Sequence, residues 1–452
     1  MSGTLMANNP IVNIFKIKEL RNKLFFTFVI FVIFRLGCVL TIPGIDAGAL
    51  ITYFDDLVKH NKNAFASYMD FFAGGAFSNF SVFMLGVMPY VSTQIILQLA
   101  LIIFPSLKRI AQEDGGQRKI AAWTRIGTVF VCLIQSLAVT VYADSIPGAI
   151  IIENHLAFRL LAMLTVTTGA MITVWLGDLI TAHGIGNGIS MLIFAGIVAR
   201  LPNAIIELGD KVSKGEINAV FVIVVLLMFV GIIALVVFEQ RGERRIPVHY
   251  AKRVVGKRMY GSQNSYIPFK INPSGVIPVI FASSFLTFPL QIVSSLGNSA
   301  EVTASARWIA RLSAILTPTG WCYNILLVLL IIFFAYFYTQ VTMNPTEIAK
   351  RIRENGGSIP GIRTDKTESY MQKVLNRLIL PGSLYLALIA VLPTIIQNIF
   401  RFPQSISMLM GGTSLLILVG VDLDMMSQIE AVLKMHHADG LVKKGNLRSH
   451  RL

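Results

Sequence analysis

Two segments of this sequence are rich in arginine and lysine, the side chains that bind phosphate and carboxylate groups. One is RGERRIPVHYAKRVVGKRMYG at residues 241–261, and the other runs from Asn344 to Tyr370. The second contains GGSIPGIRTDK at 356–366, whose glycines and proline favour turns. Projecting basic loops suit a polyanionic or acidic partner, such as the phosphates of RNA. The alternative is that these basic residues only set the membrane topology.

Residue types that carry catalysis or bind metals do not form a known pattern here. None of the seven histidines lies in an HExxH motif, and no G-x-S-x-G or P-loop motif is present. The three cysteines all fall inside apolar runs without ligand spacing, which favours packing roles: they are Cys38, Cys132 and Cys322. We therefore expect no enzymatic activity, no metal and no cofactor, so any directed process must draw its energy from elsewhere.

The elements that must position the basic loops are membrane-spanning helices. Of 452 residues, 54% are hydrophobic and 14% are charged, whereas soluble domains carry about 25% charged residues. Apolar runs of roughly 20 residues, the length that crosses a bilayer, recur along the chain. Because they do not alternate as barrel strands do, we predict an all-α membrane protein with ten transmembrane helices. The ten runs are 23–42, 79–104, 121–142, 156–176, 188–207, 217–238, 274–297, 322–341, 379–398 and 409–427.

The net charge of +15 is distributed asymmetrically. If the N-terminus is cytoplasmic and ten helices alternate, most lysines and arginines fall in cytoplasmic segments. The opposite face then holds only Lys59, Lys62, Lys211, Lys214, Arg307, Arg311 and Arg401. This distribution follows the positive-inside rule and predicts that both termini are cytoplasmic.

Ionisable residues within the apolar runs are few. Arg35 lies inside the first run, and we interpret it as a structural residue that pairs within the bundle or reaches toward the interface. No carboxylate lies mid-run with an evident basic partner. A secondary solute transporter with inverted repeats, the main alternative, would show mid-membrane charge and a polar substrate pocket. A membrane enzyme or an insertase that acts alone is a third class, for which no catalytic or polar groove pattern is present.

Six segments resemble the SecY family, the channel-forming subunits of the bacterial Sec protein translocase. They occur in the order expected for that family along nearly the whole chain. The segments are TIPGID at 41–46, SVFMLGVMPYVSTQIILQL at 81–99, WLGDLITAHGIGNGISMLIFAGIVA at 175–199, YAKRVVGKRMYGSQNSYIPFKINPSGVIPVIFASS at 250–284, NPTEIAKRIRENGGSIPGIRT at 344–364 and GGTSLLILVGVDLDMMSQIE at 411–430.

The resemblance implies ten spans in two pseudo-symmetric inverted halves around an hourglass pore. The N-terminal half would be 1–212, with a plug near 64–80. The C-terminal half would be 213–428, with long cytoplasmic loops at 239–273 and 342–378, and residues 429–452 would form a cytoplasmic tail.

It also implies a function, a location and partners. The chain would be the protein-conducting channel of the general secretory pathway in the bacterial inner membrane, passing unfolded preproteins across and releasing apolar segments into lipid. The implied partners are SecE and SecG-like small subunits, the SecA ATPase, signal sequences, and the ribosome, whose RNA would contact the cytoplasmic loops.

A hydrophobic pore ring is the first implied site. Two of its pairs have i, i+4 spacing, which places both members on one helix face, and aliphatic side chains at a constriction repel water and ions. The family often has isoleucine at both positions in the second span, where this chain has valine. By resemblance the ring is Val87, Val91, Ile189, Ile193, Ile280 and Ile417.

A plug helix between the first two spans is the second implied site. Phe65, Met69 and Phe72 fall at i, i+4 and i+7, which predicts an apolar face too short to span a membrane. Gly74 and Gly75 follow as a flexible joint. The alternative is a re-entrant packing helix that does not move.

A lateral gate and a docking surface complete the implied sites. Ser92, Gln135 and Asn272 resemble a polar cluster across the seam of the gate, where each interhelical hydrogen bond contributes less than about 2 kcal/mol. The chain has Thr93 where the family commonly has alanine or serine. The predicted docking residues for SecA and the ribosome are Arg253, Lys257, Arg258 and Arg363.

Overall fold

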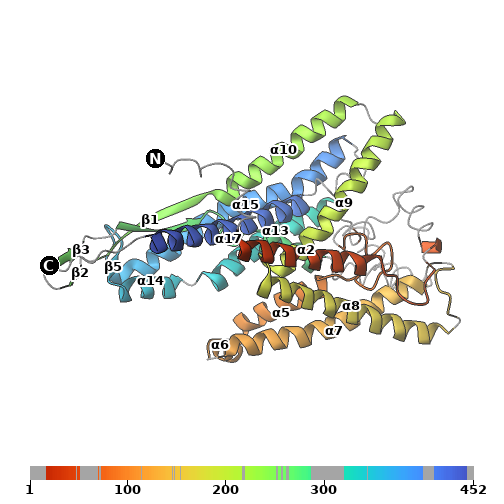
Figure 1. Cartoon of the computed structure of the whole chain (residues 1–452), viewed down its shortest axis with the longest axis horizontal. Coiled ribbons are helices and arrows are strands. Elements are labelled where there is room, and N and C mark those ends of the chain that lie inside the picture. The colour runs from red at the N-terminus through yellow and green to blue at the C-terminus, as the bar shows by residue number, and fades with distance from the viewer. Residues whose placement is uncertain are drawn as a thin grey trace. The chain divides into compact units, whose positions relative to one another are not determined.

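A computed structural model describes residues 17–46, 48–50, 70, 73–113, 115–144, 146, 148–152, 154–215, 219–250, 253–255, 258–260, 264–286, 320–343, 345–400 and 412–444. The described chain is mostly helical (Figure 1). It divides into two compact units, the first formed by Met1–Arg200 with Val421–Leu452 and the second by Leu201–Gly420.

Long helices build the first unit. They are α2 (Lys18–Val39), α5 (Met88–Ile103), α7 (Gly116–Asp144), α8 (His155–His183) and the first part of α9 (Gly188–Ser213), with the short α6 (Pro105–Gln112). The end of α17 (Gly412–Lys444) belongs to the same unit. Helices α7 and α8 pack side by side as a hairpin, and α5 packs against α7 (Figure 1).

Helix α5 begins later than the apolar run 79–104 suggests. Residues 73–87 form turns, in which Phe80 and Gly86 have positive φ angles of 41° and 54°. Pro89 then stands in the first turn of α5, where its missing N–H group is tolerated. Phe80, Met84 and Leu85 are buried, so the hydrophobicity of this run serves packing within the protein as well as a span. At its other end, α5 meets α6 at a bend of 109°.

The turn between α8 and α9 contacts both the start of α2 and the later part of α17. Leu20 of α2, Ile185 of this turn and Ile429 of α17 form one buried apolar cluster. The Gly186 N–H donates a hydrogen bond of 2.8 Å to Gln428 Oε1. The start of α2 and the later part of α17 therefore pack on the same turn.

The second unit contains the later part of α9 and the first part of α17. Its other helices are α10 (Ala219–Arg241), α13 (Trp321–Thr342), α14 (Pro345–Glu354), the 3-10 turn η1 (Thr364–Lys366) and α15 (Thr367–Phe400). A shorter apolar helix covers Ile277–Leu286. Helix α13 packs against α15, and the Tyr385 hydroxyl of α15 donates a hydrogen bond of 2.9 Å to the Leu235 carbonyl of α10.

The described residues of the basic loop that follows α10 form β-strands. Strand β1 (Glu243–Tyr250) pairs antiparallel with β4 (Asn264–Lys270), with Ile246 opposite Ile267, and its far end pairs with β5 (Gly357–Ser358). Strands β2 (Arg253–Val255) and β3 (Arg258–Tyr260) form a second antiparallel pair. The alternating Ile246 and Val248 face a core completed by residues of β4, α14 and α15, and Figure 1 shows α14 beside this sheet.

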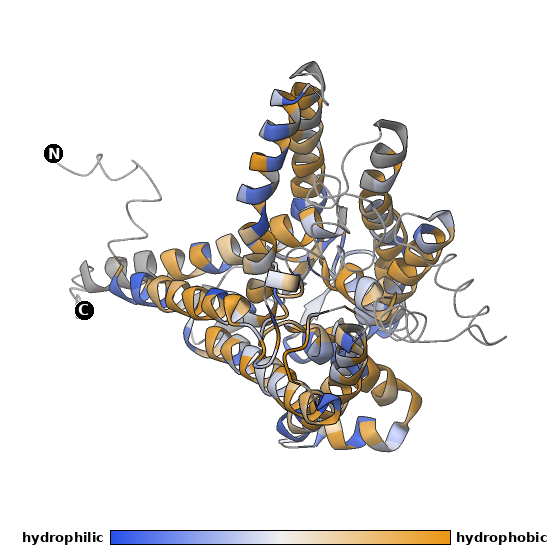
Figure 2. Cartoon of the chain, turned by 90° about the vertical axis from the view of Figure 1, so that its right-hand side faces the viewer, coloured by the Kyte–Doolittle hydropathy of each residue, from blue (hydrophilic) through white to orange (hydrophobic). Residues whose placement is uncertain are grey.

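Seven helices among the described residues are long and apolar enough to cross a membrane, or eight if the bent pair α5–α6 counts as one span. Figure 2 shows hydrophobic residues along most of the length of the long helices. Helix α10 exposes Leu227, Val230 and Phe238. Such large apolar surfaces require an apolar environment, which lipid supplies.

Candidate functional site: pore, plug, gate and docking residues

The first unit holds four of the six predicted ring residues. Val87 and Val91 are buried at the start of α5, and the Val91 N–H donates a hydrogen bond of 3.1 Å to the Val87 carbonyl. This helical bond places both side chains on one face, as the spacing predicts. Ile193 of α9 is also buried. Ile189 is only half-buried and packs on α8, where its Cδ1 lies 2.7 Å from the point that a Cβ on Gly177 would occupy.

The other two ring residues belong to the second unit. Ile280 lies in the apolar helix Ile277–Leu286, and Ile417 lies in the first part of α17. Both side chains are buried, Ile417 completely. Gly420 follows Ile417 by three residues, and a Cβ there would lie 2.5 Å from Val276 Cγ1. Within the second unit, α17 therefore approaches the start of the helix that carries Ile280.

Only part of the predicted plug is described. Phe65, Met69 and Phe72 lie outside the described residues, whereas Gly74 and Gly75 have φ angles of +65° and +93°. A Cβ on Gly74 would lie 2.8 Å from Gly196 Cα of α9. Glycine at position 74 thus provides both a left-handed backbone conformation and a close approach to α9.

A cluster of charged residues surrounds these glycines. Arg200 of α9 forms an ion pair with Asp70 Oδ2, and the Ser78 N–H donates a hydrogen bond of 2.7 Å to Asp70 Oδ1. Arg35 of α2 donates a hydrogen bond of 2.5 Å to the Gly74 carbonyl, which agrees with its predicted structural role. The pairing of Asp70 with Arg200 was not predicted, because 130 positions separate them and neither lies in a recognisable motif.

The predicted gate residues are buried and use their polar atoms in different ways. The Ser92 hydroxyl donates a hydrogen bond of 3.0 Å to the Met88 carbonyl within α5. Gln135 of α7 is buried, and its Oε1 has no hydrogen-bond partner within the described part of the chain. Asn272, in the second unit, donates to the Gly275 carbonyl and accepts from the Ser274 hydroxyl, both at 2.8 Å. Asn272 therefore stabilises the turn before the helix of Ile280.

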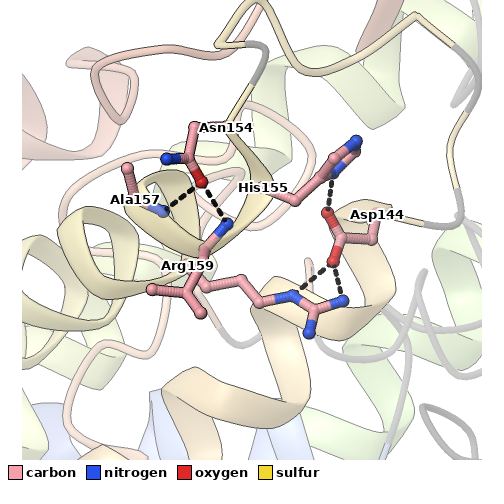
Figure 3. Close-up of polar contacts among 6 residues, drawn as sticks. Asp144, Asn154, His155, Ala157 and Arg159 are labelled. Carbon is pink, nitrogen blue, oxygen red and sulfur yellow. Dashed lines mark hydrogen bonds and ion pairs between the residues drawn. The ribbon is translucent and has the colours of Figure 1, made fainter.

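Two further ion pairs tie α7 to α8. Arg125 lies 2.7 Å from Asp178 near one end of the hairpin. At the other end, Asp144 accepts a hydrogen bond of 2.6 Å from Arg159 Nε and lies 3.2 Å from His155 Nδ1 (Figure 3). Asn154 starts α8 by accepting hydrogen bonds from two backbone N–H groups of the first turn, as an N-cap residue does.

The predicted docking residues lie on the second unit. Arg253 and Arg258 are in β2 and β3, and Lys257 lies outside the described residues. Arg363 is exposed just before η1. On β1, Arg245 donates a hydrogen bond of 2.7 Å to Glu243 and stacks over Tyr266. The hydrogen bond to Glu243 raises the pKa of the Arg245 guanidinium.

Within the described ranges, no group of three or more histidine, cysteine, aspartate or glutamate residues could hold a metal ion. The arrangement instead offers buried aliphatic side chains inside helices and exposed guanidinium groups at a folded sheet. Aliphatic groups can exclude water from a constriction, and guanidinium groups can bind phosphate or carboxylate groups.

Known proteins are similar to this sequence over almost its entire length. A sequence model of the family described as SecY matches residues 81–426. The protein translocase subunit SecY of Borreliella burgdorferi is 44% identical over 425 residues, which cover 94% of this chain and 95% of that protein. The protein translocase subunit SecY of Escherichia coli K12 is 38% identical over 436 residues, which cover 96% of both chains.

Solved structures share the fold. One described as a protein-conducting channel aligns with a TM-score of 0.62 at 17% identity, covering 94% of this chain and 97% of the other. Sec61 in a canine ribosome–channel complex from the endoplasmic reticulum aligns with a TM-score of 0.58 at 17% identity, with the same coverage. Together with the apolar helices, the sequence relatives show a multi-pass membrane protein, and the chain belongs to the SecY family.

Proposed function

We propose that this chain is the protein-conducting channel of the Sec translocon in the bacterial inner membrane. It passes unfolded preproteins across the membrane and releases apolar segments into lipid. The observation that carries this proposal is the match to translocase subunits over nearly the full length of both chains. The fold of the solved channels supports it independently.

The finer architecture is a ten-span bundle in two inverted halves, 1–212 and 213–428, followed by the tail 429–452. The described helices support most of the ten spans, and the run 274–297 begins with the helix Ile277–Leu286. Both termini are cytoplasmic in this proposal. The buried contact of Leu20 with Ile429 supports it, because α2 and α17 then have these ends on one side of the membrane.

The ring and the plug close the resting channel. Val87, Val91 and Ile193 supply buried aliphatic groups from two helices of one unit, and Ile280 and Ile417 supply them from the other. Such a ring repels ions and offers a passing peptide no hydrogen bond, so the sequence of the peptide is unimportant. Ile189, which packs on Gly177, has a smaller share in this ring unless its side chain turns.

Opening requires partners that supply energy and a signal. SecA or a translating ribosome docks on the cytoplasmic loops 239–273 and 342–378 through Arg253, Lys257, Arg258 and Arg363. A signal sequence parts the lateral gate at Ser92, Gln135 and Asn272, and SecE and SecG-like subunits complete the complex. A shift between closed and open populations describes the process thermodynamically. A similar chain, Sec61, is present in a ribosome–channel complex, which supports the ribosome as a partner.

Reconstitution tests this function. The purified complex in liposomes with SecA and ATP should carry a preprotein into a protease-protected lumen, and a preprotein without its signal sequence should remain accessible. Absence of signal-dependent protection would refute the proposal. Counterflow of small solutes measured in the same liposomes would instead identify a solute transporter, which the relatives do not favour.

A further inference from the structure

The turn that contains the two plug glycines is held by charge as well as by packing. We define the anchored turn as Asp70 with Ala73–Phe80. We propose that the ion pair between Asp70 and Arg200 is a latch that keeps the anchored turn on α9 and so sets how readily the resting channel opens. This inference rests on the proposed channel function.

Asp70 has a double role in the anchored turn. Its Oδ1 accepts the Ser78 N–H at 2.7 Å, and its carbonyl accepts the Gly75 N–H at 2.9 Å, so it closes the turn internally. Its Oδ2 meets Arg200 of α9. One carboxylate therefore couples the internal shape of the turn to its attachment, and loss of the ion pair also loosens the turn.

Glycine gives Arg200 its access to the turn. A Cβ on Gly75 would lie 3.3 Å from Arg200 Nη2, which is tight for a carbon atom. Arg35 of α2 adds a second attachment through the Gly74 carbonyl. Two arginines from two different helices thus hold one short turn, and only one carboxylate of the turn balances them.

The burial of this ion pair increases the cost of removing one of its partners. The side chains of Asp70 and Arg200 are only 13% and 25% exposed, so water screens the pair weakly. Removing one partner of such a pair leaves an uncompensated charge in a poorly hydrated site. The free energy lost this way is localised in the contact between the turn and α9, and it therefore favours departure of the turn over general unfolding.

The test uses variants that change charge and little else. Asp70→Asn retains an oxygen that can accept the Ser78 N–H, and Arg200→Gln retains a polar side chain, so each removes the ion pair alone. In the complete complex in planar bilayers, each should raise resting conductance roughly tenfold or more. Amide exchange of peptide 73–80 should rise in parallel, while exchange in α7 and α8 stays unchanged.

The double variant distinguishes loss of one shared ion pair from two independent effects of the single substitutions. Asp70→Asn with Arg200→Gln removes both members of the ion pair, so neither is left without its partner, and its leak should be no greater than that of either single variant. The charge-conserving variants Asp70→Glu and Arg200→Lys should stay close to wild type, and they provide the comparison if a neutral variant does not accumulate. The matched control is Asp144→Asn, which removes an ion pair of the same unit far from the plug glycines along the chain and should not raise conductance.

Three outcomes would overturn the latch: neutral variants that leak like wild type, leaks that add in the double variant, or charge-conserving variants that leak like neutral ones. Failure of the channel proposal would look different. It would appear as loss of signal-dependent translocation by the wild-type complex, measured on the same preparation before any variant is compared.

Discussion

Replacing Gly74 by alanine adds one carbon atom to the anchored turn at the point where it touches α9. The backbone at Gly74 has a φ angle of +65°, and the new Cβ would lie 2.8 Å from Gly196 Cα and 3.0 Å from the Gly196 carbonyl oxygen. Both atoms are backbone atoms, so neither can rotate aside. Since carbon atoms prefer about 3.5–4.0 Å, the turn must withdraw from α9 by roughly 1 Å.

The magnitude follows from two contributions. A left-handed conformation costs an alanine about 1–2 kcal/mol, and the backbone contact raises the total to roughly 2–3 kcal/mol. Because every 1.4 kcal/mol changes an equilibrium tenfold, the closed state should lose about 30-fold to 150-fold in population relative to the open state.

Resting conductance of the complex in planar bilayers measures this shift directly. The control is Gly86→Ala, whose φ angle of +54° imposes a similar backbone strain but whose Cβ would meet no atom within 4 Å. Gly86→Ala should lower the melting temperature with little change in leak, whereas Gly74→Ala should leak strongly. Equal leaks from the two variants would refute the reasoning, because strain without contact would then suffice.

Three further predictions concern the ring, the docking surface and the sheet. Serine at the ring positions Ile193, Ile280 and Ile417 together should raise resting ion conductance, since hydroxyl groups admit water where aliphatic groups exclude it; unchanged conductance in planar bilayers would argue against the ring assignment. Arg363→Glu should weaken SecA-driven translocation without lowering the melting temperature, and normal translocation in proteoliposomes would contradict its docking role. Val248 is fully buried, so Val248→Ala should destabilise the sheet by about 2 kcal/mol. Limited proteolysis after β1 should become faster, and unaltered proteolysis would show that the core relaxes around the cavity.

The helical spans were the most predictable part of this fold. The runs 121–142 and 156–176 lie within α7 and α8, because apolar stretches of this length have no other way to satisfy their backbone groups in lipid. The helices are longer than the runs because polar residues at their ends continue them. Hydrophobicity alone could not reveal that residues 73–87 form buried turns, since packing inside the protein and contact with lipid demand the same residue types.

The folded sheet was less predictable. Residues 241–261 read as a basic loop, yet Ile246 and Val248 occupy alternate positions of β1 and face a core completed by α14 and α15. Their core partners come from segments about a hundred positions later, so the local pattern was too short to specify a strand.

In the candidate site, too, local sequence predicts some features, whereas others depend on distant segments. Val87 and Val91 share a helix face as i, i+4 spacing requires. The attachment of Asp70 to Arg200, by contrast, depends on how α9 lies against the turn, which no local spacing encodes. Gly74 and Gly75 have positive φ angles, and only their neighbours show that close approach also requires glycine. Their role as a flexible joint stays a prediction.

The turn between α8 and α9 has a consequence for how the chain is made. Ribosomes deliver Gly186 to the membrane 242 residues before the Gln428 side chain that accepts its hydrogen bond. Leu20 and Ile185 are likewise synthesised well before Ile429, which packs against them. A chain that ends before Ile429 therefore leaves the apolar Leu20 side chain exposed near the start of α2. The first unit is complete only after α17 has been synthesised.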